Sequence, residues 1–89
     1  MNLMLTTTCN STDDSYENGY LSVKSEFAAW CDSSRCISAK VDDTQLVELF
    51  FDVNPPKLKA WFSKSSTQEM FKARNFVPTR YTFEALQMG

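Results

Sequence analysis

DDTQLVELFFDVNPPKLKAWF, residues 42–62, holds the densest apolar pattern of the chain and decides the predicted fold. Its two opening aspartates can accept hydrogen bonds from the free N–H groups at the start of a helix, and an apolar run follows them. Asn54 is a good N-cap, and Pro55 suits the first position of a second helix because its missing N–H needs no partner there. The stretch therefore predicts two helices, over 44–52 and 55–64, joined by a short turn.

The second of these helices has one apolar face and one basic face. Leu58, Trp61 and Phe62 recur three and four residues apart, which places them on a single side of a helix. Such spacing is more typical of a core than of an aromatic stacking surface. The opposite side carries the polar residues Lys57, Lys59, Ser63 and Lys64.

Two short helices of this kind resemble the helix-turn-helix of DNA-binding regulators. The resemblance covers residues 44–63, with Val47 and Phe51 on the inner face of the first helix. It departs from the family pattern at Glu48, where a small residue is usual, and at Asp52, where glycine is usual. An ordinary helical hairpin packed on a core is the alternative interpretation.

The flanking segments predict further helices and strands. Apolar residues alternate with polar ones over 36–41 and again over 80–86, as they do in half-buried strands. A helix is expected to begin at Ser22, and a short one over 67–74 has Ser66 as its cap. The order resembles the winged-helix variant of the helix-turn-helix. We therefore expect an α+β, mainly helical, winged-helix-like domain of three to four helices with a two- or three-stranded antiparallel sheet.

The 89 residues are enough for one domain. Residues 1–19 are rich in Thr, Ser, Asn and Asp, which predicts a polar, partly disordered tail or an edge strand, although Leu3, Leu5 and Thr7 alternate weakly. The turn dipeptide Asn18-Gly19 would then lead into a single domain over 20–89.

The charge is distributed unevenly along the chain. The net charge is only −2, but residues 1–52 carry nine acidic and three basic side chains, and residues 53–89 carry six basic and two acidic ones. A chain with one phosphate-facing surface shows such asymmetry, which favours double-stranded DNA as a partner.

The helix-turn-helix resemblance implies a role for each basic residue. The outer face of 55–64 would enter the major groove, with Lys57, Lys59 and Ser63 reaching base edges and Lys64 a phosphate. Lys72, Arg74 and Arg80 would hold the DNA backbone on either side. In the rival assignment the helix over 67–75 reads the bases instead. A domain this small usually binds DNA as a dimer, so a homodimer is expected.

The composition argues against an enzyme. The chain has no histidine, the usual proton shuttle at neutral pH, and its two glycines cannot build a phosphate-binding loop. We expect no cofactor. Three cysteines without histidine cannot complete a four-ligand zinc site, so no metal is expected either. Cys31 and Cys36 could meet across a turn, but they are better interpreted as small buried residues in a reducing cytoplasm.

No apolar run approaches the length that spans a membrane, so no membrane association and a cytoplasmic location are expected. The function predicted from the sequence is a small DNA-binding protein of helix-turn-helix type, of the kind that regulates genes of phages or mobile elements. The alternative is a small inhibitor or adaptor that binds another protein, of the type that phages use against host systems. Its acidic half, including Asp13, Asp14 and Asp42, would then be the working surface.

Overall fold

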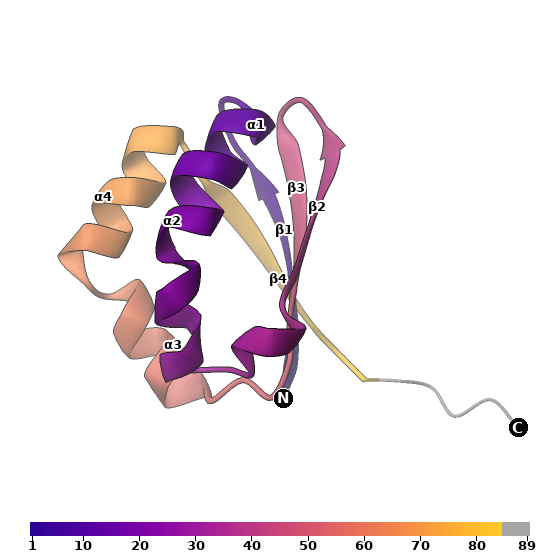
Figure 1. Ribbon diagram of the computed structural model, residues 1–89, viewed down its shortest axis with the longest axis vertical. Helices are drawn as coiled ribbons and strands as arrows, with labels where there is room; N and C mark the ends of the chain where they lie inside the picture. The colour runs from indigo at the N-terminus through magenta and orange to yellow at the C-terminus, as the bar shows by residue number, and fades with distance from the viewer. Residues whose placement is uncertain (85–89) are drawn as a thin grey trace, which may run out of the picture.

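The computed structural model describes residues 1–84, which form one antiparallel sheet covered by helices (Figure 1). The strands are β1 (Asn2–Thr8), β2 (Ile37–Asp42), β3 (Gln45–Phe50) and β4 (Val77–Phe83), in the spatial order β2-β3-β1-β4. A helical run consists of α1 (Thr12–Asp14), a π-helical stretch (Ser15–Tyr20), α2 (Leu21–Val23) and a 3-10 stretch (Lys24–Ala29). A 3-10 turn (Ser33–Arg35), α3 (Pro55–Phe62) and α4 (Ser65–Arg74) follow later in the chain.

The connectivity is that of a split βαβ arrangement. The first helical run links β1 to the β2–β3 hairpin, and α3 with α4 links β3 to β4, which returns to pair with β1. Figure 1 shows α1 to α4 on the same side of the sheet. This architecture, also called ferredoxin-like, carries many unrelated functions, so the fold by itself indicates none of them.

The winged-helix prediction is wrong, because the sheet has four strands and residues 45–50 form one of them. Leu46, Glu48 and Phe50 point toward the helices, whereas Val47 and Leu49 point to the opposite side of the sheet. A short run that is apolar on both sides fits a strand between two others as well as it fits a helix. Here β1 and β2 pair with its two edges, and this pairing decides the conformation.

The aspartates that open the stretch form a hairpin turn instead of a helix start. The carboxylate of Asp42 accepts a hydrogen bond of 2.9 Å from the backbone N–H of Thr44, and it also accepts one from the Thr44 hydroxyl. This local bond offers the backbone an alternative to the helix that an N-cap aspartate would begin. The first helix expected over 44–52 is therefore absent from the structure.

Residues 1–19 form β1 and the first part of the helical run, where we expected a tail or an edge strand. β1 lies between β3 and β4, and Leu3, Leu5 and Thr7 are buried beneath the helices. Gly19 lies within the helical run and not in a turn. A Cβ atom there would come within 3.0 Å of the ring of Phe76, so the close approach explains the glycine.

The second half of the deciding stretch is confirmed. α3 begins at Pro55, and the Asn54 side chain accepts a hydrogen bond of 3.2 Å from the backbone N–H of Lys57. Leu58 and Trp61 are buried, as their spacing predicts. The strands expected over 36–41 and from residue 80 correspond to β2 and β4, although residues 85 and 86 lie outside the described part.

Two helix starts differ from the prediction. α4 begins at Ser65 with Lys64 at the cap position, so the expected cap at Ser66 is not formed. The helix predicted from Ser22 is the end of the run that starts at Thr12, where the Ser11 hydroxyl accepts from the N–H of Asp14. Ser, Thr and Asp are common along both segments, and each of them can cap a helix. The sequence therefore does not decide at which of these residues the helix begins.

Aromatic side chains fill the space between the sheet and the helices. The ring of Phe27 lies 5.3 Å from that of Phe50 and 5.7 Å from that of Trp61, and Trp30 lies 4.9 Å from Phe50. These rings meet edge to face or tilted, the arrangements that aromatic pairs prefer. The core thus lies entirely on the helix side of the sheet.

Candidate functional site

The second face of the sheet is covered by no part of residues 1–84 (Figure 1). We call it the open face. Its residues alternate along each strand with the buried ones. They are Asn2, Met4, Thr6 and Thr8 on β1; Ile37 and Ala39 on β2; Gln45, Val47 and Leu49 on β3; and Val77, Thr79, Tyr81 and Phe83 on β4.

The strand register fixes the neighbours on the open face. Met4 pairs with Leu49 on one side and with Tyr81 on the other, and Leu49 pairs in turn with Ile37. Paired residues in a sheet point to the same face, so these four form one apolar row across all four strands. Thr6, Val47 and Ala39 belong to the next row.

The open face is exposed and carries almost no charge. Ile37, Val77 and Tyr81 keep 50%, 58% and 47% of their surface exposed. None of its residues is a lysine, an arginine or a glutamate. Asp42 lies at one corner, but its carboxylate is turned back to Thr44. A contiguous apolar patch bordered by polar residues is typical of an interaction site.

Charged residues lie at the border of the open face. At one end of β3, the Arg35 guanidinium is 3.2 Å from the carboxylate of Asp52 and lies 4.3 Å from the centre of the Phe51 ring. The open face therefore has an uncharged centre and an ionic border at this end, the pattern found in protein interfaces.

The edges of the sheet are less suited to a partner than its face. β4 contains Pro78, which has no N–H to donate to an added strand. The pairing of β2 is irregular after Lys40, whose ammonium group bridges the carboxylates of Asp13 and Asp43. Proline, bulges and edge lysines are features that prevent strand addition.

The central strands of the open face, β1 and β3, carry none of the aromatic residues with which four-stranded sheets stack RNA bases. Such sheets carry aromatic side chains on their RNP segments, which stack two or three bases. Here the central strands β1 and β3 present Met4, Thr6, Val47 and Leu49. The aromatic residues of this face are Tyr81 and Phe83 on the edge strand β4 and Phe51 just after β3, whose ring lies 5.6 Å from that of Phe83. The chemistry of this face fits an apolar protein surface better than a nucleobase.

The DNA-binding residues predicted from the sequence lie on the helix side and at the β4 edge, and five of the seven border two separate grooves. Lys59, Ser63 and Arg80 border one surface groove between α3, α4 and β4. Lys57 and Lys64 border another, beside Glu26. Lys72 is exposed on α4, and Arg74 lies at its C-terminal end.

Three of these basic groups already have partners. Lys64 pairs with Glu26 at 3.1 Å, Arg74 pairs with Asp14 at 3.5 Å, and the Arg80 guanidinium lies 4.9 Å from the centre of the Phe62 ring. Lys57, Lys59 and Lys72 form no ion pair with any described residue. The sequence-predicted set is therefore not a single basic surface.

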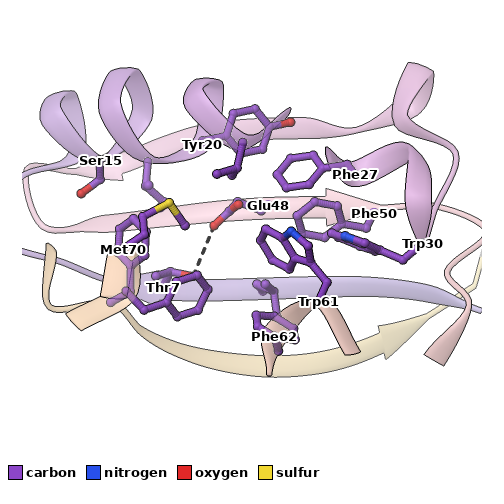
Figure 2. A pocket seen from close by; sticks show the side chains of 15 residues that line it. Thr7, Ser15, Tyr20, Phe27, Trp30, Glu48, Phe50, Trp61, Phe62 and Met70 are labelled. Carbon is purple, nitrogen blue, oxygen red and sulfur yellow. Dashed lines mark hydrogen bonds between the residues drawn. The ribbon is translucent and has the colours of Figure 1, made fainter. Parts of the chain in front are cut away.

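An internal cavity lies between the sheet and the helices, and Figure 2 shows the Glu48 carboxylate pointing into it among aromatic rings. Burial raises the pKa of Glu48 to about 7. The cavity has a volume of about 30 Å³, which exceeds the roughly 10–15 Å³ that a single buried water molecule needs. This space is small compared with the pockets of a few hundred cubic ångströms that hold organic ligands.

The sequence prediction missed the open face because it placed residues 44–52 in a helix. A signal was present in the alternation of Leu3, Leu5 and Thr7, which marks β1 as a strand with one buried side. A strand with one buried side needs a neighbouring strand along each edge. The apolar run over 45–50 is the best candidate in the sequence for one of these neighbours of β1.

Comparisons with protein-family models, with curated proteins and with solved structures found no match for this chain. Within residues 1–84, no helix has the length and apolar character needed to cross a membrane. The same residues contain no cluster of three or more His, Cys, Asp or Glu side chains that could hold a metal ion.

Proposed function

We propose that this protein acts by binding a partner protein through the open face. The observation that carries the proposal is the absence of charge from an exposed apolar surface that spans four strands, in a chain whose charged residues lie elsewhere. Burying such a surface gains hydrophobic free energy without stripping water from a charge. The partner surface is apolar and uncharged at its centre.

The size of the open face favours a different protein over a second copy of this chain. Four strands about 4.8 Å apart, each about 22 Å long, present roughly 400 Å² of projected surface. A stable interface buries about 800 Å² of accessible surface on each partner, which favours a partner that covers the border of the open face as well as its centre. A larger partner can extend past the sheet to the charged pair Arg35–Asp52.

This function corresponds to the inhibitor or adaptor that the sequence left as an alternative, although the surface differs from the acidic one expected there. The cytoplasm is the proposed location, because Cys9, Cys31 and Cys36 are all free thiols, which a reducing compartment maintains.

Site-specific photo-crosslinking in the cells that produce the protein tests the proposal. A photoreactive phenylalanine analogue at Tyr81 or at Ile37, both exposed on the open face, is expected to yield one discrete cross-linked partner. The same analogue at Lys72, exposed on α4, is the control and is expected to yield none. An Ala39→Lys substitution, which places a charge on the open face, should abolish the product while leaving the fold intact.

Two results contradict the proposal. Cross-linking that is equally efficient from Lys72 would show that the open face is not the contact surface. A product of twice the chain mass would show that a second copy covers it.

DNA binding stays a prediction and is the second candidate. It is supported by Lys57, Lys59 and Lys72, which are exposed and have no carboxylate partner among the described residues. It predicts retention of random duplex DNA that weakens steeply with added salt and is lost in a Lys57→Ala/Lys59→Ala variant. Retention that is absent at low salt would exclude it.

A further inference from the structure

Two thiols face each other across the 3-10 turn that precedes β2. The Sγ atoms of Cys31 and Cys36 lie 3.6 Å apart, and the turn Ser33–Arg35 joins them. Both side chains are half-buried beside the aromatic core. Cys9, the third thiol, is buried at the other end of β1, where its Sγ lies 3.7 Å from the carbonyl oxygen of Thr44.

The backbone between the two thiols is held in place by several hydrogen bonds. The carboxylate of Asp32 accepts from the N–H of Ser34 at 3.2 Å and from its hydroxyl at 2.6 Å. The N–H of Asp32 in turn donates to the carbonyl of Phe51 at 2.9 Å, which ties the turn to the sheet. The two thiols are thus kept close by the fold and do not have to find each other by diffusion of the chain.

We propose that Cys31 and Cys36 form a thiol–disulfide exchange site that reacts with small-molecule disulfides of the glutathione class and closes to an internal disulfide. A disulfide bond is about 2.05 Å long, so the two sulfur atoms must approach each other by about 1.5 Å to form it. The inference concerns the chemistry of the helix-to-strand turn and does not depend on the proposed function of the open face.

The environments of the two thiols set the order of the steps. Burial raises the pKa of Cys31 to about 12. Burial also raises the pKa of Cys36, but the hydrogen bond from Cys31 and the nearby charge of Lys24 oppose this increase. Both thiols are therefore protonated at neutral pH, and the exchange becomes faster as the pH rises. Cys36, whose thiolate form is favoured by Lys24 and by the Cys31 thiol, attacks first, and Cys31 resolves the product.

Each step exchanges one sulfur–sulfur bond for another. The Cys36 thiolate attacks one sulfur of oxidised glutathione, the glutathione disulfide breaks, and one glutathione thiolate leaves. Cys31 then loses its proton to solvent and attacks the Sγ of Cys36 in the mixed disulfide, which expels the second glutathione thiolate. The two cysteines are oxidised, and oxidised glutathione is reduced to two thiols that take up the two protons.

Equilibration of the folded protein with mixtures of oxidised and reduced glutathione, followed by alkylation and mass spectrometry, tests the proposal. As the share of oxidised glutathione rises, the number of thiols per chain that react with the alkylating reagent should fall from three to one in a single step. Cys9 should be the thiol that still reacts. A Cys31→Ser variant should instead retain glutathione on Cys36. A Cys36→Ser variant should react at Cys31 at least about tenfold more slowly.

A second measurement uses only the wild-type chain, in case a serine variant does not fold. The equilibrium constant for closing the internal disulfide should be at least about tenfold higher in buffer than in denaturing urea, because the fold holds the thiols together. An equal constant in both conditions would overturn the proposal. Stable glutathione adducts on the folded wild type, without the internal disulfide, would overturn it as well.

Discussion

The hydroxyl of Thr7 on β1 donates a hydrogen bond of 3.4 Å to the carboxylate of Glu48 on the neighbouring strand β3. It is the only hydrogen bond that a described side chain makes to this carboxylate, which lies in the aromatic cavity of Figure 2. The charged form of Glu48 is therefore poorly compensated, and burial raises its pKa from 4.5 to about 7.

A Glu48→Gln substitution is expected to change how stability depends on pH. Between about pH 4.5 and pH 7 the folded state binds more protons at Glu48 than the unfolded state does, so the free energy of unfolding falls as the pH rises. Ionisation of Glu48 lowers the free energy of unfolding by roughly 3 kcal/mol in total. The glutamine of the variant cannot ionise, so the variant keeps this stability. The variant should thus gain stability relative to wild type on going from about pH 5 to about pH 8.

Urea unfolding of both proteins at the two pH values measures this effect. A Glu69→Gln variant, which removes an exposed carboxylate from α4, controls for the change in net charge. A stability difference between wild type and Glu48→Gln that stays constant with pH would contradict the prediction.

The indole N–H of Trp61 donates to the carboxylate of Glu26 at 2.9 Å, and the ammonium group of Lys64 lies 3.1 Å from the same oxygen. This contact joins α3 to the helical run that follows β1. Glu26→Ala leaves the half-buried indole N–H without its partner, which should lower the free energy of unfolding by about 1 to 2 kcal/mol. Lys64→Ala, which removes only the exposed ion pair, should cost less than about 1 kcal/mol.

Thermal unfolding of the two single variants and of the double variant measures both costs. The effect of Lys64→Ala should largely vanish in the Glu26→Ala background, because both act through one oxygen atom. Fully additive effects would show that Glu26 and Lys64 do not interact in solution.

Alternating substitutions along β3 distinguish a strand from the helix that the sequence predicts. Phe50 is 2% exposed and packs on Phe27 and Trp30, so Phe50→Ala should cost about 3 to 5 kcal/mol. Leu49 lies on the open face, and Leu49→Ala should cost only about 1 kcal/mol. Chemical denaturation of the two variants provides the comparison. Equal costs at positions 49 and 50 would contradict the strand register.

The parts of the fold that depend on local signals could be predicted from the sequence. Asn54 and Pro55 begin α3 because a cap and a first-turn proline act within a few residues. The alternation in β2 and β4 is also local, since one side of each strand differs from the other. The predicted bounds agree with β2 to within one residue and with the start of α3, whereas β4 begins three residues before the predicted strand over 80–86.

The parts that depend on pairing between distant segments could not be predicted in the same way. Residues 45–50 carry apolar side chains on both faces, and only their pairing with β1, about forty residues earlier, makes them a strand. The sequence predicts a turn at Gly19 because nothing in the neighbouring residues reveals the contact with Phe76. The open face was missed for the same reason, since it exists only once four separate strands are aligned.

Asn75 ends α4 in a left-handed conformation with a φ of 56°, and its N–H bonds back to the carbonyls of Phe71 and Lys72. Asparagine tolerates this region better than other residues that have a side chain, and glycine tolerates it best. Asn75→Gly should therefore leave the free energy of unfolding unchanged or raise it slightly, whereas Asn75→Ala should lower it by about 1 kcal/mol. The two variants remove the same amide and differ only in the Cβ atom, so urea denaturation of the pair isolates the backbone conformation. If Asn75→Ala were as stable as Asn75→Gly, the left-handed cap would not form in solution, and the step from α4 into β4 would have to follow another path.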